Sequence, residues 1–165
     1  MTKNELRCMD EIERAFLIAE DYYGRSLQRC HMVQFSRRLK VTAGRAAYAW
    51  DCSPLSIKLS IPVMELNPEE FISRTPAHEA AHLIIAQVYG IETAPHGKKW
   101  KNLMRVLERD GSTKHSMKVV RKEYHYIASC GTPVTLLSGR HRNIQQGATY
   151  VLRGGGKITR EGLVE

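Results

Sequence analysis

The sequence predicts an α+β fold in which a helical core with a small antiparallel sheet precedes a small C-terminal β module. Three observations lead to this prediction. Apolar residues recur at helical spacing in three segments, three short segments after the first of them alternate apolar and polar residues, and the glycine-rich C-terminal part is only weakly periodic. A chain of 165 residues can bury a core without disulfides. We place the core in residues 1–115 and the module in residues 116–165.

The first helix is expected over residues 2–23. Thr2 and Glu5 have the spacing of a capping box, in which each side chain bonds the backbone N–H of the other residue. Gly24 can end the helix in a left-handed conformation. The face that packs on the core is expected to carry Leu6, Met9, Ile12, Phe16 and Ala19.

Three strands are expected next, over His31–Leu39, Ala43–Trp50 and Leu55–Ile61. The third alternates most strictly, and in the second Ala46, Tyr48 and Trp50 share one face. Turn residues at 51–54 separate the last two segments, so we expect them to pair as an antiparallel hairpin.

The most specific pattern in the chain is H-E-x-x-H at residues 78–82. Residues four apart on a helix lie about 6 Å apart along its axis and about 40° apart around it. His78 and His82 can therefore bind one zinc ion from one helix face. Glu79 lies one position on, where it can polarise a zinc-bound water and act as general base rather than as a ligand.

Thr75 is expected to cap the helix that carries this motif, with Pro76 in its first turn and Gly90 at its end. Asn67 and Pro68 begin a short helix just before it. Pro76 therefore either starts a new helix or kinks a continuous one. A wide apolar stripe predicts that the motif helix is buried; it consists of Ala77, Ala81, Ile84, Ile85 and Val88.

A catalytic zinc site usually has three protein ligands and leaves the fourth position to water. His96 is the natural third candidate, because it follows the helix after a short loop and Gly97 lets the backbone come close to the site. A further helix is expected over residues 98–110, ended by Gly111, with Trp100 packing it against the metal site. Its apolar face is formed by Trp100, Leu103, Met104 and Leu107.

Beyond this helix, short strands are expected at Tyr124–Ile127, Val134–Leu137 and Thr149–Leu152. The four cysteines are scattered without a C-x-x-C pair, which argues against a four-cysteine zinc ribbon and against a secreted disulfide framework. No apolar run is long enough to span a membrane, and the N-terminal segment is too polar for a signal peptide. We expect a monomer, cytoplasmic or nucleoid-associated, with no membrane partner.

The formal net charge of +8 is unevenly distributed. Residues 96–165 hold 14 Lys/Arg against 5 Asp/Glu, whereas residues 1–95 hold 11 against 12. This asymmetry indicates a polyanion binder, and the alternative is a surface biased for solubility. We expect phosphate contacts without sequence readout from Lys98, Lys99, Lys101, Lys118, Arg121, Lys122, Arg140 and Arg142, and Tyr124, Tyr126 or Tyr150 could stack on unpaired bases.

Several of these elements together resemble the SprT-like/Spartan metalloprotease family. They are A-G-x-A at Ala43–Ala46, L-N-P at Leu66–Pro68, H-E-x-x-H at His78–His82 and H-G-x-x-W at His96–Trp100. The resemblance continues more faintly past residue 120, through residues 126–131, 140–144, Gly147 and Tyr150, where the family has a C-terminal zinc ribbon.

The resemblance implies a zincin-like core and a zinc-dependent endopeptidase that acts on DNA-bound or DNA-crosslinked proteins, with DNA as activator. It also implies that His78, His82 and His96 bind one catalytic Zn²⁺ and that Glu79 is the general base. The family pattern would put ribbon cysteines at about residues 128, 130, 152 and 155, where this chain has Ala128, Cys130, Leu152 and Gly155. His125 and His141 could join Cys130, but no fourth ligand is evident, so we expect a degenerate ribbon without a second zinc.

Two rival functions stay open at this point. The protein could be a DNA-binding or structural module whose zinc is only architectural, or a peptidase of soluble proteins without a nucleic-acid role. Many such sites add a residue that stabilises the oxyanion, and His115, Tyr124 and His125 are the candidates.

Overall fold

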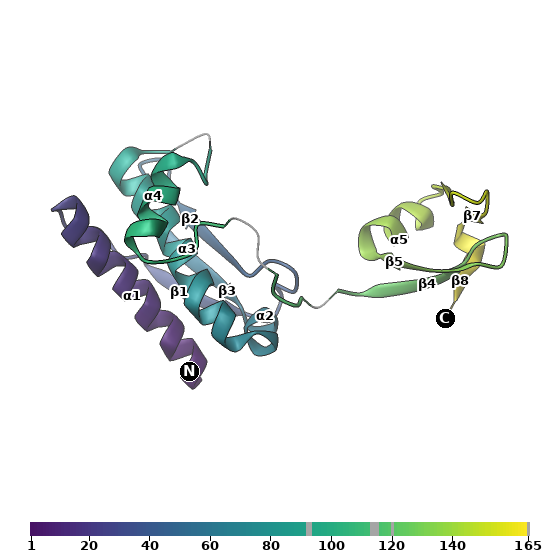
Figure 1. Cartoon of the computed structure of the whole chain (residues 1–165), viewed down its shortest axis with the longest axis horizontal. Helices are drawn as coiled ribbons and strands as arrows, with labels where there is room; N and C mark the ends of the chain where they lie inside the picture. The colour runs from purple at the N-terminus through teal and green to yellow at the C-terminus, as the bar shows by residue number, and fades with distance from the viewer. Residues whose placement is uncertain (92–93, 113–115, 120, 165) are drawn as a thin grey trace. The chain divides into compact units, whose positions relative to one another are not determined.

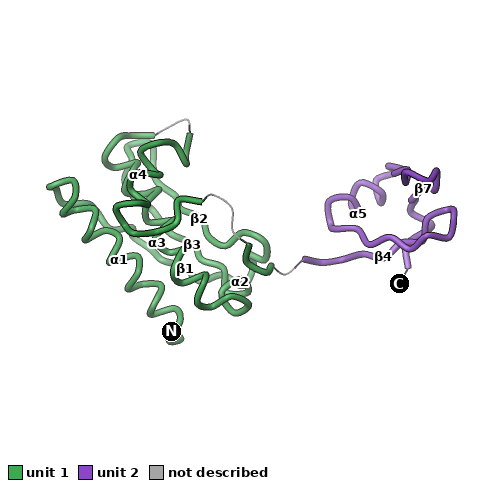
Figure 2. The backbone as a smooth tube through the Cα atoms, viewed as in Figure 1, with its two compact units in different colours: residues 1–120 green, residues 121–165 purple. Residues whose placement is uncertain are grey.

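The structure is a computed structural model that describes residues 1–91, 94–112, 116–119 and 121–164. The chain divides into two compact units, Met1–Val120 and Arg121–Glu165 (Figure 2). From the sequence we expected the boundary after residue 115. The separate role expected for each part stays a prediction. No helix among the described residues combines the length and apolar character needed to cross a membrane.

The first unit is built around one central helix, α3 (Pro68–Tyr89). Helix α1 (Lys3–Tyr23) lies beside α3, a three-stranded sheet covers another side of it, and α4 (Lys98–Val106) also packs against it (Figure 1). The core between these elements is continuous. Its largest fully buried side chains include Phe16, Ile57, Phe71, Leu83, Ile84 and Trp100.

Helix α1 follows its sequence signals closely. The hydroxyl of Thr2 accepts a bond from the backbone of Glu5 at 3.2 Å, and the Glu5 carboxylate accepts one from the backbone of Thr2 at 2.7 Å, which confirms the capping box. Gly24 ends the helix at φ 62. Cys8, Ile12, Ala15, Phe16 and Ala19 form its buried face.

The sheet consists of β1 (Met32–Ser36), β2 (Gly44–Tyr48) and β3 (Pro54–Ser60) in the order β1-β3-β2. Strands β2 and β3 form the expected antiparallel hairpin. Strand β1 pairs with β3 in parallel, so the prediction of an antiparallel sheet was wrong. An alternating pattern shows which residues share a face, and it is the same for either strand direction. Trp50, expected on the face of Ala46 and Tyr48, lies instead in the hairpin turn and is 94% exposed.

Helix α3 is continuous through Pro76, which corrects the expected cap at Thr75. Pro76 has no N–H for the carbonyl of Ile72, a loss that often breaks helices. Here Thr75, Pro76 and Ala77 are all buried, so tertiary packing holds this turn in helical form. Gly90 ends the helix at φ 84.

Asn67 precedes α3 as expected, but its side chain does not cap the helix. Its amide group donates to the carbonyl of Lys118 at 2.8 Å and accepts from the Lys118 backbone N–H at 2.8 Å. Asn67 thus fastens a distant segment to the start of α3. The short helix before it, α2 (Ile61–Leu66), was not predicted; Ser60 caps it by accepting from the N–H of Val63 at 3.1 Å.

Helix α4 ends at Val106, earlier than the predicted residue 110. Glu108 has φ 56, a left-handed conformation that interrupts the helix before Gly111 is reached. The predicted apolar face is confirmed, because Trp100, Leu103, Met104 and Leu107 are all buried.

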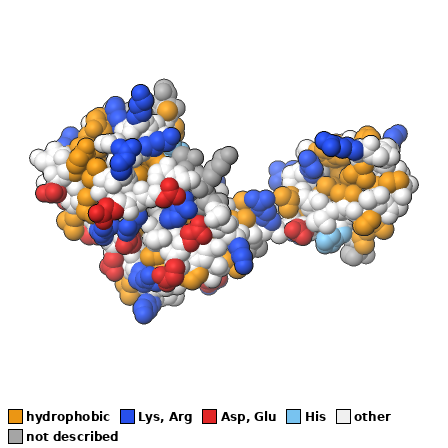
Figure 3. Space-filling model, in the orientation of Figure 1, with side chains coloured by type: hydrophobic (Ala, Val, Ile, Leu, Met, Phe, Trp, Pro, Cys, Tyr) orange, Lys and Arg blue, Asp and Glu red, His pale blue; other side chains and the backbone are white. Residues whose placement is uncertain are grey.

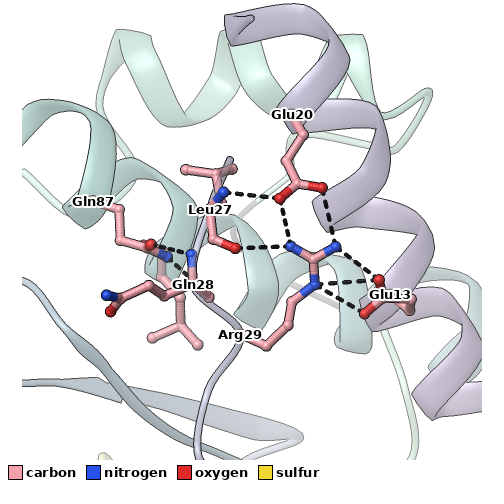
Figure 4. Close-up of polar contacts among 7 residues, drawn as sticks. Glu13, Glu20, Leu27, Gln28, Arg29 and Gln87 are labelled. Carbon is pink, nitrogen blue, oxygen red and sulfur yellow. Dashed lines mark hydrogen bonds and ion pairs between the residues drawn. The ribbon is translucent and has the colours of Figure 1, made fainter. Parts of the chain in front are cut away.

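Arg29 lies in the loop after α1, and its side chain connects this loop to α1 through hydrogen bonds with Glu13 and Glu20 (Figure 4). Its guanidinium donates to Glu13 at 2.7 Å and to Glu20 at 2.8 Å, and lies 4.8 Å from the centre of the Phe16 ring. The hydrogen bonds from Arg29 and from the backbone of Leu27 lower the pKa of Glu20 to about 2. The neighbouring Gln28 exchanges two hydrogen bonds with Gln87 of α3.

The second unit has a sheet of β5 (Pro133–Leu137), β4 (Glu123–Ile127) and β8 (Leu163–Val164), and a separate pair of β6 (Tyr150–Val151) and β7 (Lys157–Ile158). The three predicted strands are present: β4 and β5 each begin one residue earlier than predicted, and β6 is shorter by one residue at each end. A 3₁₀ turn, Arg160–Gly162, precedes β8, and helix α5 (Ser138–Gln145) was not predicted. Gly139 and a single buried apolar side chain, Ile144, leave α5 without a helical apolar pattern.

Candidate metal centre and cleft

Three histidines converge where α3 meets the start of α4. His78 and His82 lie one turn apart on α3, and His96 approaches from the loop that precedes α4. One ring nitrogen from each lies within 4.8 Å of the others, and the Nε2 atoms of His78 and His96 are 3.0 Å apart. The predicted set is therefore brought together, and its geometry could hold a metal ion.

Trp100 fixes the imidazoles from the side of α4. Its buried ring is stacked on His82 with centroids 5.7 Å apart, and it meets His78 and His96 edge-on with centroids 4.7 Å apart in each case. The expected packing of Trp100 against the site is confirmed.

The environment favours the neutral form of His82 and His96. Burial, together with the nearby His96, lowers the pKa of His82 to about 4. Burial and the positive charge of Lys101 also lower the pKa of His96. A neutral imidazole has a nitrogen lone pair available, as a metal ligand needs. The donor set of three converging imidazoles thus fits a zinc site that keeps a fourth position open.

Glu79 lies on the inner side of α3, against strand β2. The residue is 7% exposed, and burial raises the pKa of its carboxyl group to about 8 despite a hydrogen bond from the Ala46 backbone. Gly44 makes room for it: a Cβ at Gly44 would lie 2.7 Å from the Cγ and Oε1 atoms of Glu79. The A-G-x-A element at Ala43–Ala46 is therefore the wall against which Glu79 is positioned.

A cleft of about 290 Å³ opens beside His78 and Glu79. Its walls are the start of β2, the turn of α3 around Arg74, and the residues Asp110, Ser112 and Met117. Arg74 donates to Asp110 at 3.0 Å and to Glu70 at 3.4 Å, so one side chain ties two of these walls together. The metal centre is thus open on one side.

The predicted cationic residues are all exposed, and they lie on both units. Lys98, Lys99 and Lys101 are on α4, and Lys118 follows later in the first unit. Arg121, Lys122, Arg140 and Arg142 belong to the second unit. Sequence reasoning missed Arg105, although its spacing of seven residues from Lys98 places it on the same helix face.

The tyrosines proposed for base stacking differ in exposure. Tyr126 is 1% exposed and belongs to the core of the second unit, which removes it as a stacking surface. Tyr124 is half-buried and stacks on His141 with centroids 3.5 Å apart, and Lys122 lies 5.0 Å from its ring. Tyr150 is also half-buried, with Arg140 at 5.8 Å from its ring.

Of the oxyanion candidates, His115 lies outside the described residues. Tyr124 and His125 lie in the second unit, where His125 bonds the hydroxyl of Thr135 at 3.2 Å and Tyr124 stacks on His141. The role of all three stays a prediction.

Two turns with the same hydrogen-bond pattern lie at the positions where the family pattern would put the ribbon cysteines. In each turn the first residue donates its N–H to the carbonyl four residues on, and its own carbonyl accepts the N–H three residues on. The first turn starts at Ala128 and the second at Leu152. A Cβ at Gly156 would lie 2.2 Å from the Sγ of Cys130 and 3.5 Å from the Cβ of Ala128, so the turns face each other.

Comparison with known proteins gives one consistent result. A family model described as the SprT-like family matches residues 12–121. The chain is similar to Protein SprT of Pseudomonas fluorescens (strain SBW25), with 31% identity over 147 residues that cover 86% of each chain. It is also similar to Protein SprT of Shewanella oneidensis, with 28% identity over 148 residues, 87% of this chain and 90% of the relative. No solved structure matches the chain.

Proposed function

The chain belongs to the SprT-like family, and from this premise we propose that it is a zinc-dependent endopeptidase that acts on proteins bound or crosslinked to DNA. One observation carries the proposal. The imidazoles of His78, His82 and His96 converge, and His78 lines an open cleft together with the buried carboxyl group of Glu79.

Zinc is the metal that fits this donor set best, because three neutral nitrogen ligands with an open fourth position are typical of catalytic zinc sites. When bound, zinc would supply an electrophile for a peptide carbonyl and would lower the pKa of a water molecule towards about 7. The chain itself supplies the ligands, their orientation through Trp100, and the base.

Glu79 is proposed to move the protons of the reaction. As a carboxylate it accepts a proton from the attacking water, and it then donates this proton to the amine that leaves the cleaved peptide bond. Burial raises the pKa of this carboxyl group, so its carboxylate form is a stronger base than that of an exposed glutamate, and a bound zinc cation would favour that ionised form. The Ala46 amide and the close approach of Gly44 hold the carboxylate in one position.

Strand β2 is proposed to bind the substrate backbone. Within the described residues it is an edge strand, paired only with β3. The Ala46 amide bonds Glu79 rather than β3, so this side of the strand faces the cleft. An extended peptide can add to such an edge by main-chain hydrogen bonds, which favours cleavage within an accessible, unfolded segment.

DNA association is supported by charge. The exposed cations of α4 and of the second unit give the phosphate contacts that sequence-independent binding requires. A protease held on DNA would meet proteins that are themselves bound there, at raised local concentration.

The test is cleavage of a DNA-binding protein, with and without DNA, by chain loaded with one equivalent of zinc. We expect cleavage that DNA stimulates, one zinc ion per chain by elemental mass spectrometry, and loss of this zinc in His78→Ala. Cleavage that DNA leaves unchanged would make the protein a peptidase of soluble substrates. A Glu79→Gln variant with unaltered activity would assign the zinc an architectural role.

A further inference from the structure

A second cavity lies on the first unit, where the C-terminal end of α3 meets α4. It has a volume of about 460 Å³. Figure 3 shows Lys and Arg side chains gathered at the end of the first unit where Figure 1 places α4. The lining residues, which we call the α4 pocket, are Tyr89, Lys98, Lys99, Lys101, Asn102 and Arg105.

Three cations of the α4 pocket, Lys98, Lys101 and Arg105, form no ion pair with an acid among the described residues. Lys98, Lys101 and Arg105 have the spacing i, i+3 and i+7, so they lie on one face of the helix. The helix contains no Asp or Glu. Within the part of the chain that the structure describes, none of these three side chains forms an ion pair with a carboxylate. Such a group of like charges favours an anion as ligand.

Aromatic rings border the same pocket. Tyr89 is 45% exposed and Tyr22, at the end of α1, is 49% exposed. Tyr23 links the two, with ring centroids 4.8 Å from Tyr22 and 5.9 Å from Tyr89 in edge-on contacts. The ammonium group of Lys99 lies 4.3 Å from the centre of the Tyr89 ring.

Polar contacts fix the rings relative to the cations. The side-chain amide of Asn102 donates to the Tyr22 hydroxyl at 3.1 Å, and Arg105 donates to the Asn102 carbonyl oxygen at 3.1 Å. Tyr22, Asn102 and Arg105 therefore form one connected row from α1 to α4. The pocket combines positive charge with partly exposed, positioned rings.

We propose that the α4 pocket binds a short segment of single-stranded nucleic acid. Lys98, Lys101 and Arg105 contact the phosphates, and Tyr22 or Tyr89 stacks on an unpaired base. A duplex hides its base faces, and an acidic peptide offers the tyrosines no stacked bases, so a single strand matches both features of the pocket.

The inference rests on the proposed association with DNA and goes further, because it places one contact on the unit that carries the metal centre. Helix α4 begins directly after His96 and Gly97, and α3 carries both His78 and His82 before it ends at Tyr89. A strand in the pocket would lie on α3 and α4, the two helices at whose junction the three histidines converge. The second unit would then supply further phosphate contacts but not the only ones.

Binding is measured by fluorescence anisotropy on the full chain, with a labelled dT oligonucleotide and a duplex of the same length, between 50 and 300 mM salt. The variant replaces Lys98, Lys101 and Arg105 with Gln. We expect its affinity for the single strand to fall about tenfold or more at low salt, and the slope of log K against log salt to fall by about 2, since each lost contact to a single strand removes about 0.7. The matched control, which removes three exposed cations of the same unit elsewhere, is Arg25→Gln with Arg38→Gln and Lys40→Gln.

Crosslinking then locates the base. An oligonucleotide with 5-iododeoxyuridine is irradiated on the wild-type chain, and crosslinked peptides are identified by mass spectrometry. We expect crosslinks at Tyr22 or Tyr89, and loss of those crosslinks in the triple variant. Crosslinks confined to the second unit, with a salt slope unchanged in the triple variant, would overturn the inference. Equal loss in the control variant, which indicates only non-specific charge, would overturn it as well, and so would preferential binding of the duplex.

The outcomes separate this inference from the proposed function. Peptidase activity without nucleic acid, measured on an unstructured protein substrate, is expected to be equal in the wild type and in a Lys98→Gln, Arg105→Gln variant, which keeps the positive charge of Lys101 near His96. If wild type binds no nucleic acid, both the DNA association and the α4 pocket are refuted while peptidase activity can stand. If Glu79→Gln keeps full activity but the crosslinks map to Tyr22 or Tyr89, the peptidase proposal fails and the pocket stands.

Discussion

The two compact units bury their side chains to very different degrees. The core of the first unit includes large side chains from every helix around the sheet, whereas the buried core of the second consists of Tyr126, Ala128, Leu136, Ile144 and Ile158. Several apolar residues of the second unit are half exposed or more, among them Ile127 and Val151. Figure 3 shows hydrophobic side chains on the visible face of this unit. The larger core can hold features that are unfavourable by themselves, namely a buried carboxyl group and a proline inside a helix.

Excess positive charge, in contrast, is denser on the second unit than on the first. Residues 121–165 hold 7 Lys/Arg against 3 Asp/Glu, and residues 1–120 hold 18 against 14, so the same excess of +4 is concentrated on a much shorter unit. A small unit has a high surface-to-volume ratio and gains stability from few contacts. We therefore expect the first unit to position the catalytic side chains and the second unit to offer a positively charged surface.

The largest effect is expected where the first unit buries Glu79. We expect Glu79→Gln to lower peptidase activity by about 10²–10⁴-fold, the usual contribution of a general base. Stability at neutral pH should be unchanged or higher, because the amide is neutral and nearly the same shape, so the free-energy cost of burying a carboxyl group whose pKa is raised by that burial is removed. Activity assays and thermal unfolding measure both. Exposed Glu108→Gln is the control, and a large fall in Tm for Glu79→Gln would show that the carboxyl group is structural.

The next test asks whether the second unit depends on its few core residues. Ile144 is fully buried, and Ile144→Ala should cost about 2–5 kcal/mol, enough to unfold so small a unit. Hydrogen exchange should then show lost protection within residues 121–164 and unchanged protection in the first unit. Zinc content should stay at one per chain. If protection falls across both units together, they unfold cooperatively and the comparison between them fails.

Gly44 provides a test at intermediate magnitude. In Gly44→Ala the new Cβ would lie 2.7 Å from the Cγ of Glu79, so the carboxyl group or the strand must move. We expect a loss of about 1–3 kcal/mol in unfolding free energy and a fall in activity. Gly139→Ala in α5, where no atom lies within 4 Å of the added carbon, should stabilise by up to about 1 kcal/mol. Denaturant titrations of both variants compare a tightly packed glycine with an open one.

The smallest effect concerns the Arg29 cluster. Glu20→Gln should lower stability by about 1–2 kcal/mol at pH 7, since Glu20 accepts hydrogen bonds from Arg29 and Leu27. Because its pKa is lowered to about 2, the wild-type advantage is complete above the ordinary glutamate pKa of 4.5 and is lost as the pH falls towards 2. Urea unfolding of both proteins between pH 7 and pH 2 tests this. Glu65→Gln, at an exposed ion pair with Arg37, should differ little from wild type at any pH.

Local signals predicted the parts of the fold that depend on near neighbours. The capping box of Thr2 and Glu5 and the shared helix face of His78 and His82 follow from spacing alone. The direction of β1 and the passage of α3 through Pro76 depend on tertiary packing, which a periodic pattern does not encode. Helix α5 has too few apolar residues to give a pattern at all.

The candidate site shows the same limit. His96 was a candidate from its loop position, and the family resemblance was needed to choose it. The contact of Gly44 with Glu79 joins residues far apart in sequence, so only the structure gives the physical reason for a glycine there. The α4 pocket depends on Tyr22 of α1 meeting Asn102 of α4, a contact for which the sequence has no signal.

The two hydrogen bonds between Asn67 and Lys118 affect how force on the chain would reach the first unit. Force applied from the second unit meets Val119, which packs on the core, and then Lys118, whose backbone the Asn67 amide ties to the start of α3. Asp110, Ser112 and Met117, which line the cleft, come before both contacts in the chain. Such force would therefore act on the core and on the start of α3 before it acts on these cleft residues.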